Sequence, residues 1–235
     1  MTTSAKNAFD STMQSVRALN DLDAAHSDPP APEETSTAEG LRAGAIVLMV
    51  GGFERYLKAM VEELLNSITQ AEPSCEVEKL PPLLRTEATF RALEVAMKGL
   101  PWEPTRTREA RLPDVLTAAR RIANNEIAGR EVAQTAGNPT SDQVKSICKI
   151  LDYGPVFNHI DSSFSRRWGS PVAKTFVRDQ LDIIVDRRHS VAHTASILTT
   201  SRSDIATWTR FMQILVETLD EALERHVRRI ISRAR

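Results

Sequence analysis

Apolar residues along this chain recur at steps of three and four, the spacing that lines one face of an α-helix. The longest such pattern predicts a central helix whose apolar face comprises Ile46, Val50, Phe53, Leu57, Met60 and Leu64. Gly51 and Gly52 lie inside this helix, where each costs about 0.8–1 kcal/mol relative to alanine. We therefore expect another helix to approach closely at these glycines.

The last predicted helix begins near Ser201 and carries a heptad-like apolar seam. The seam residues are Ile205, Trp208, Met212, Leu215, Leu219 and Ala222. A seam of this kind packs along neighbouring helices or along a second subunit, and the sequence leaves both alternatives open. The arginines that follow it are expected to form a solvated helix end.

Shorter helical patterns fill the rest of the chain. Helices are predicted over residues 83–98, from Pro113 to near residue 129, from the capping residue Thr140 to residue 151, and from Pro171 onward. Residues 154–170 are predicted to be a loop. No two-residue alternation with hairpin turns is present in the sequence, so we expect an all-α bundle with long antiparallel helices.

The first 40 residues differ from the rest in composition and charge. Residues 4–26 predict a weakly amphipathic helix, and residues 27–40, rich in Pro, Glu, Ser and Thr, predict a flexible linker. Seven acidic and two basic residues give this segment a charge of −5, which leaves +4 on the remainder, since the whole chain carries −1. We expect an acidic helical extension over residues 1–40 and one helical domain over residues 41–235.

Several function classes lose support from composition and motifs. Cys75 and Cys148 are too few for a disulfide framework and form no C-x-x-C pair, so we expect reduced thiols. The sequence has no Gly-rich phosphate loop and no G-x-S-x-G elbow, which argues against nucleotide hydrolysis and serine-esterase chemistry. The longest apolar run falls short of the roughly 20 residues of a membrane span, so a cytoplasmic location without membrane contact is expected.

The segment DRRHSVAHT at residues 186–194 carries the strongest candidate chemistry. Arg188 lies five positions before His193, and Arg187 offers a second spacing. Phosphodiester cleavage needs a group that moves a proton near neutral pH, which histidine supplies, and a cation that holds the phosphate, which arginine supplies. The segment follows an apolar helical stretch and precedes the last long helix.

The context of this segment resembles the motif of the HEPN superfamily ribonucleases. These proteins carry an arginine, then a polar residue, and a histidine four to six positions after the arginine; Arg188, His189 and His193 match those places. The stretches GFERYL at 52–57 and GNPT at 137–140 resemble the RiboL-PSP-HEPN branch, and the resemblance covers roughly residues 40–225. His189 stands where asparagine or aspartate is common, and Thr194 replaces a frequent glycine.

The resemblance implies a compact HEPN-type helical bundle that dimerises and cleaves RNA without a metal or other cofactor, through attack by the ribose 2′-hydroxyl. It implies that His193 is the acid and base and that Arg188 holds the phosphate, with His189, Arg187 and Glu54 in supporting roles. It further implies a toxin or defence effector that acts on RNA as a homodimer, restrained by an antitoxin or inhibitor protein.

Helix geometry agrees with two cooperating motifs. Residues five apart on a helix are rotated by about 140° and separated by roughly 7.5 Å along the axis, so one motif makes a poorly closed site. Two copies related by a two-fold axis would supply an arginine and a histidine to one phosphate.

Alternative interpretations remain for the same residues. Arg188 and His193 would also serve as a structural pair at a helix end, within a non-catalytic RNA- or protein-binding module. Asp186, His189 and His193 share one helix face, so a metal-dependent hydrolase is a second alternative.

The candidate supporting residues also have structural interpretations. Glu54 would be a core-edge carboxylate paired with an arginine. Arg166 and Arg167 would clamp RNA beside Trp168, or Trp168 would be a core aromatic. We assign no role to His26, His159 or His226.

Overall fold

A computed structural model of the 235-residue chain describes residues 3–99, 105–124, 138–194 and 200–235, without the side chains at 77 and 192–194. Every regular element in these ranges is helical, which confirms the predicted all-α class. No helix within them is both long and apolar enough to cross a membrane.

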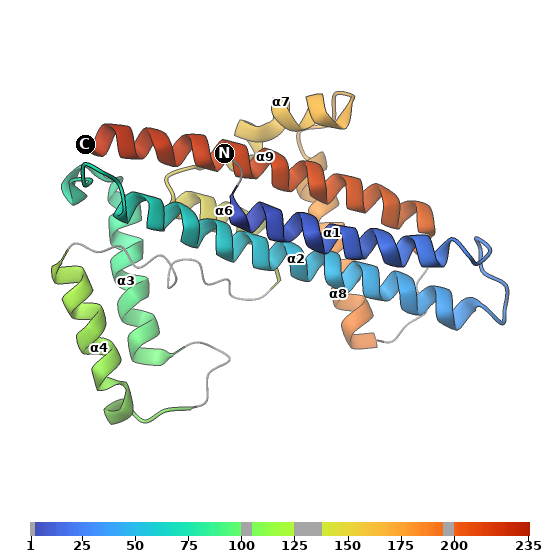
Figure 1. The fold of residues 1–235 in the computed structure, drawn as a ribbon, viewed down its shortest axis with the longest axis horizontal. Coiled ribbons are helices and arrows are strands. Elements are labelled where there is room, and N and C mark those ends of the chain that lie inside the picture. The colour runs from blue at the N-terminus through green and yellow to red at the C-terminus, as the bar shows by residue number, and fades with distance from the viewer. Residues whose placement is uncertain (1–2, 100–104, 125–137, 195–199) are drawn as a thin grey trace.

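Three long helices lie side by side and form the body of the molecule (Figure 1). They are α1 (Ser4–Asp23), α2 (Thr35–Thr69) and α9 (Arg202–Ala234). The predicted apolar face of α2 is buried, and so is the whole heptad-like seam of α9. Because α9 packs on α1, α2 and α7, its seam is covered by neighbouring helices of the same chain.

The acidic N-terminal segment is part of this body. Phe9, Met13 and Val16 of α1 are buried in the common core, and α1 packs along α2. A Cβ atom added at Gly52 would lie 2.8 Å from the Thr12 methyl carbon, so the expected close approach occurs there, whereas Gly51 has open space. The second helix starts at Thr35, inside the segment predicted to be a linker.

The remaining elements are shorter. They are the 3-10 helix η1 (Val77–Lys79), α3 (Pro82–Lys98), α4 (Arg108–Ala123), α6 (Ser141–Ile150), α7 (Val156–Trp168) and α8 (Phe176–Thr194). Helices α3 and α4 pack on each other at one end of the molecule and extend away from the three long helices (Figure 1). Helix α8 packs on α2, and α6 and α7 each contact it.

Three further predictions of local structure are wrong. The predicted loop over residues 154–170 contains α7, whose apolar side chains Phe157, Ile160 and Phe164 are buried although polar residues surround them in the sequence. Helix α4 begins at Arg108 rather than Pro113, because the Thr107 hydroxyl accepts a hydrogen bond from the Ala110 amide and caps it. Helix α8 begins at Phe176 rather than Pro171.

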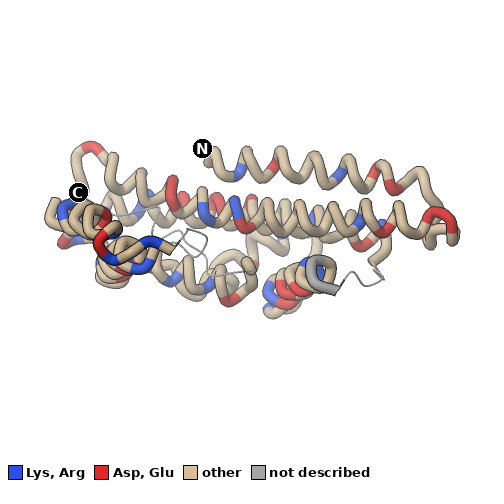
Figure 2. The backbone as a smooth tube through the Cα atoms, turned by 90° about the horizontal axis from the view of Figure 1, so that it is seen from below, with Lys and Arg blue, Asp and Glu red and all other residues tan. Residues whose placement is uncertain are grey.

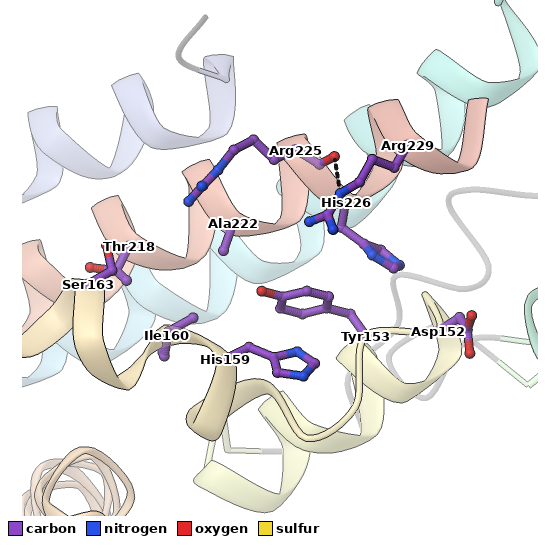
Figure 3. A pocket seen from close by; sticks show the side chains of 10 residues that line it. All are labelled: Asp152, Tyr153, His159, Ile160, Ser163, Thr218, Ala222, Arg225, His226 and Arg229. Carbon is purple, nitrogen blue, oxygen red and sulfur yellow. Dashed lines mark hydrogen bonds between the residues drawn. The ribbon is translucent and has the colours of Figure 1, made fainter. Parts of the chain in front are cut away.

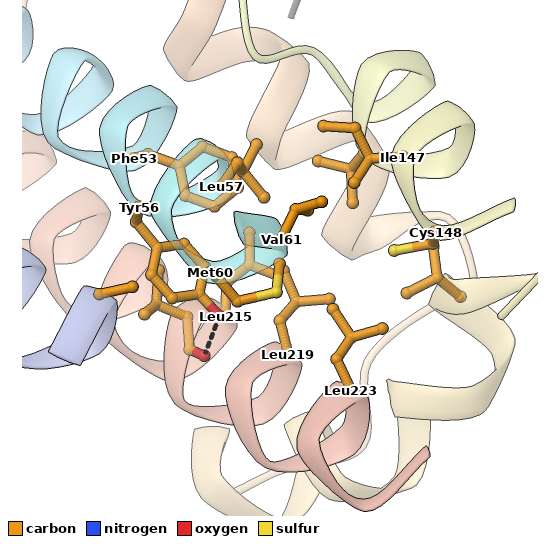
Figure 4. Close-up of a cluster of buried hydrophobic side chains, with 14 of the residues drawn as sticks. Phe53, Tyr56, Leu57, Met60, Val61, Ile147, Cys148, Leu215, Leu219 and Leu223 are labelled. Atoms are coloured by element: carbon orange, nitrogen blue, oxygen red, sulfur yellow. Dashed lines mark hydrogen bonds between the residues drawn. The ribbon is translucent and has the colours of Figure 1, made fainter. Parts of the chain in front are cut away.

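A dense part of the core lies where α2, α6 and α9 meet (Figure 4). The side chains gathered there include Phe53, Leu57, Met60, Val61, Ile147, Cys148, Leu215, Leu219 and Leu223. Burial raises the pKa of the Cys148 thiol to about 12, so this cysteine is a packing residue. This core fixes α6 and, through it, the neighbouring helix α8.

Candidate active site

Helix α8 carries the arginine–histidine motif and is held to the bundle by its apolar face. Val177, Leu181, Ile184 and Val185 are buried, and they recur at the spacing of one helix face. Arg188 lies one turn after Ile184 on the same helix face, and its side chain is partly buried. The C-terminal end of α8 extends beyond α2 (Figure 1), which leaves the motif at an edge of the molecule.

A carboxylate fixes α8 against the start of α6. Asp182 accepts hydrogen bonds from the Ser141 amide and the Ser141 hydroxyl, both at 2.7 Å. Thr140 caps the same helix by accepting a hydrogen bond from the Gln143 amide, as the sequence predicted. The acceptor at the α6 N-terminus also complements the helix dipole, so this junction is well defined.

Arg188 is bonded to the chain just before this junction. Its Nη1 donates a hydrogen bond of 2.8 Å to the amide oxygen of Asn138. Asn138 belongs to the GNPT stretch, and the next residue, Pro139, is buried. The bond therefore orients a partly buried guanidinium by means of a segment that is itself packed.

The partner of Arg188 is neutral, which determines what the guanidinium can bind. Within the ranges that the structure describes, no carboxylate lies within 4 Å of it. A guanidinium has five N–H donors in a planar fork, and the bond to Asn138 uses one of them. With only the described residues considered, the charge of Arg188 is unpaired, and a guanidinium in this state can bind an anion such as a phosphate.

His193 lies in the last turn of α8, five residues after Arg188, as the motif requires. Its backbone belongs to the described part of the structure, and its side chain does not. Asp186 and His189 are exposed, and Arg187 is partly buried. The Ser190 hydroxyl donates to the Asp186 carbonyl one turn earlier, a local helix contact.

The metal triad of Asp186, His189 and His193 includes a side chain that is not described. No group of three or more His, Cys, Asp or Glu residues able to hold a metal occurs among the described side chains. Because His193 lies outside that set, the triad remains the second alternative.

The other candidate residues lie on different elements. Glu54 on α2 forms an ion pair of 2.6 Å with Lys58, one turn later, and its supporting role stays a prediction. Arg167 pairs with Glu221 at 2.6 Å, and the Arg166 guanidinium contacts the Ser163 hydroxyl. Trp168 stacks on Phe164, so its interpretation as a core aromatic is the one the packing favours.

Arg166 and Arg167 are also far from the motif within one chain. Trp168, which follows them, contacts Phe176 at the start of α8, with ring centroids 5.6 Å apart. Twelve residues of helix separate Phe176 from Arg188, which corresponds to roughly 18 Å along the axis. The structure therefore does not bring these two arginines into the Arg188 site of the same chain.

Sequence reasoning missed two positioning residues and one cavity. Asn138 stands out in the sequence only as part of the GNPT stretch, and nothing in its local pattern points to a partner 50 residues away. Asp182 is one acid among several on α8. His159 and His226, to which no role was assigned, lie together around Tyr153 in a cavity between α7 and α9 (Figure 3).

The all-helical fold is that of the HEPN class. The chain belongs to the RiboL-PSP-HEPN family, which it matches over residues 12–225. The matched range begins at residue 12, whereas the resemblance in the sequence motifs began near residue 40. The matched range therefore includes most of α1. No curated protein and no solved structure gives a significant match to the chain.

Proposed function

We propose that this protein is a metal-independent endoribonuclease of the HEPN type. Membership of the RiboL-PSP-HEPN family supports a nuclease or RNA-related role. The observation that carries the finer proposal is Arg188, a partly buried cation oriented by the neutral amide of Asn138 and followed by His193 in the same helix. An oriented guanidinium with open donors stabilises the charge that builds on a phosphate during cleavage.

The proposed chemistry is attack by the ribose 2′-hydroxyl on the adjacent phosphate. His193 takes the proton from this hydroxyl and, as the protonated imidazole, gives a proton to the departing 5′-oxygen, and Arg188 binds the non-bridging phosphate oxygens. The step cleaves the P–O5′ bond and leaves a 2′,3′-cyclic phosphate and a 5′-hydroxyl, so it consumes no water, and the proposal gives the roles of a metal to His193 and Arg188. Histidine suits the proton transfers because its ordinary pKa is close to neutral pH.

Two copies of the motif would complete the site. Basic and acidic positions are interspersed along the helices that Figure 2 draws. Ile183, half exposed at 50%, lies on the α8 face of Arg187 and Ser190, next to the motif. We propose that a two-fold dimer covers this apolar residue and brings the two motifs together.

The cellular role proposed for this activity is that of a toxin or defence effector in the cytoplasm. An unrestrained ribonuclease damages its host, so an antitoxin or inhibitor protein is the partner expected beside RNA. The RNA-binding and protein-binding module and the metal-dependent hydrolase are the alternatives that the experiments must separate.

The decisive experiment measures cleavage of a labelled RNA in excess EDTA by purified wild type and by His193→Ala. We expect cleavage by wild type with a 2′,3′-cyclic phosphate product, and a loss of about 10²-fold or more in the variant, with an unchanged melting curve. A matched variant, His26→Ala, removes a histidine from the α1–α2 connection and should cleave like wild type.

The alternatives predict other results. Loss of cleavage in EDTA and recovery with zinc or manganese would support the metal triad. Binding of RNA without cleavage, after removal of any co-purified inhibitor, would support the binding module. For the dimer, light scattering at micromolar concentration should give twice the chain mass, and Ile183→Lys should lower both the dimer fraction and the cleavage rate. A stable monomer that cleaves at the full rate would refute the dimeric site.

A further inference from the structure

A cavity separate from the Arg188 site lies between the end of α6, helix α7 and the C-terminal half of α9 (Figure 3). Its volume is about 360 Å³, within the range of pockets that hold small ligands. The residues that line it include Asp152, Tyr153, His159, Ser163, Thr218, Arg225, His226 and Arg229. None of the residues assigned to the Arg188 site is among them.

The floor of this cavity is an aromatic cluster. Tyr153 lies between His159 and His226, with both imidazole centroids 4.8 Å from its ring (Figure 3). Burial is the main cause that raises the pKa of Tyr153 and lowers the pKa of His226, so both rings are neutral at pH 7. The His226 Nε2 lies 2.9 Å from the Leu151 carbonyl oxygen, to which the neutral ring donates.

The positive charge of the cavity comes from two arginines one helical turn apart on α9. The Nε of Arg225 donates to the Glu221 carbonyl, and the Nε of Arg229 donates to the Arg225 carbonyl. Among the described residues, no carboxylate lies within 4 Å of either guanidinium. Both arginines line the cavity, and both partly offset the rise in the pKa of the Tyr153 hydroxyl that burial causes.

A neighbouring arginine, Arg228, differs from Arg225 and Arg229 because it has an acidic partner. Arg228 lies on the same stretch of α9 and pairs with Glu224 at 2.6 Å, as an exposed helical arginine commonly does. Arg225 and Arg229 instead line the cavity, and among the described residues their hydrogen bonds are to main-chain carbonyls of α9 and not to a carboxylate. Two such forks one turn apart match an anion that has several oxygen atoms.

We propose that this cavity binds a phosphate monoester carried on a sugar. The phosphate contacts Arg225 and Arg229, and the sugar lies on the aromatic floor. Asp152 lies at one end of the cavity and Ser163 and Thr218 lie at the other (Figure 3), and the Asp152 carboxylate accepts hydrogen bonds from sugar hydroxyls. The cavity is larger than a phosphate ion alone requires, which favours a carried phosphate over the free anion.

This ligand chemistry has two sources, a free sugar phosphate or the 5′-phosphorylated end of an RNA chain. The proposal does not rest on ribonuclease activity, because the cavity shares no residue with the Arg188 site. A failure of either proposal is therefore distinguishable from a failure of the other.

The test is calorimetric titration of the full-length protein with ribose 5-phosphate, and with ribose as the uncharged control. We expect saturable binding of the phosphorylated sugar at millimolar concentration or below and no binding of ribose. Arg225→Ala with Arg229→Ala should weaken this binding by at least about tenfold, since each removes charge-assisted hydrogen bonds. Arg228→Ala, the matched control, should change it less than about twofold. All variants should melt like wild type, because these side chains are exposed.

The two sources are separated with RNA oligonucleotides that carry either a 5′-phosphate or a 5′-hydroxyl, titrated into His193→Ala so that cleavage does not interfere. An arginine-dependent preference for the 5′-phosphate assigns the cavity to RNA ends, and its absence, with ribose 5-phosphate bound, assigns the cavity to a free sugar phosphate. Absence of ribose 5-phosphate binding, or equal binding by the double variant and wild type, would overturn the proposal.

Discussion

Arg188 donates a hydrogen bond of 2.8 Å to the amide oxygen of Asn138, a residue 50 positions earlier in the chain. This bond joins the motif-bearing end of α8 to the loop in front of α6. It orients the guanidinium without neutralising it, because the acceptor is an amide and not a carboxylate.

The first prediction exchanges this neutral acceptor for a charged one of the same shape. Asn138→Asp places a carboxylate against Arg188, which then competes with the RNA phosphate for the guanidinium. We expect cleavage to fall by about tenfold to a hundredfold while the melting temperature stays the same or rises. Asn138→Ala removes the hydrogen bond that orients Arg188 but places no negative charge beside it, so it should have the smaller effect. The measurement is the initial rate of RNA cleavage beside a thermal melt.

A matched control is Asn158→Asp, which makes the same chemical change at an exposed position of α7. It should leave the cleavage rate unchanged. If Asn138→Asp cleaves RNA as fast as wild type, Arg188 is not the phosphate-binding group.

The second prediction compares two conservative changes within the motif. Arg188→Lys keeps the positive charge but loses the planar fork, so cleavage should fall by at least about tenfold. His189→Asn introduces the residue type common at this place in the HEPN family and should retain most of the activity. Rates are measured in EDTA at fixed RNA concentration. Loss of activity in His189→Asn would instead favour the metal triad, in which His189 is a ligand.

The third prediction concerns two adjacent glycines of α2 that differ in their surroundings. Gly51→Ala meets no atom within 4 Å, so it should stabilise the protein by about 0.5–1 kcal/mol through helix propensity. Gly52→Ala places a methyl group 2.8 Å from the Thr12 methyl carbon and should lose that gain, while Gly52→Val should destabilise by about 1–3 kcal/mol.

The measurement is urea unfolding, and Thr12→Ser provides the control because it removes the methyl group that Gly52 variants would meet. Thr12→Ser should recover part of the stability lost in Gly52→Ala. Equal stability of the two alanine variants would contradict the close packing of α1 on α2.

The fourth prediction is a pH dependence caused by His226. Burial lowers the pKa of its imidazole from 6.5, so the unfolded chain binds this proton more readily than the folded chain. The resulting stability is present above the unfolded pKa and is lost as the pH falls through the lowered folded pKa. His226→Gln removes this titration while keeping a hydrogen-bond donor for the Leu151 carbonyl.

We therefore expect the free energy of unfolding to fall less between about pH 7.5 and 5.5 in His226→Gln than in wild type. Urea unfolding at several pH values measures this difference. A variant whose stability falls as steeply as that of wild type would show that His226 does not contribute to the pH dependence.

The sequence by itself determined the helical class, the main helices and the motif. The apolar face of α2 and the seam of α9 were predicted from apolar residues that recur every three or four positions, a pattern visible over a short stretch of sequence. The Thr140 cap was also predicted, since a cap depends on residues within three positions of it. The last helix was predicted to begin near Ser201, the residue that caps it. The spacing of Arg188 and His193 is likewise local, and it carries the family resemblance.

Tertiary structure alone decided which distant residues meet. It placed α1 in the core, although its weak apolar pattern and the acidic segment around it had indicated an extension. It formed α7 in a segment predicted to be a loop, because Phe157, Ile160 and Phe164 gain stability only when other helices cover them. It also brought Asn138 to Arg188 and His159 and His226 to Tyr153. Such contacts depend on how helices pack across many residues of chain, and no local period or cap records that packing.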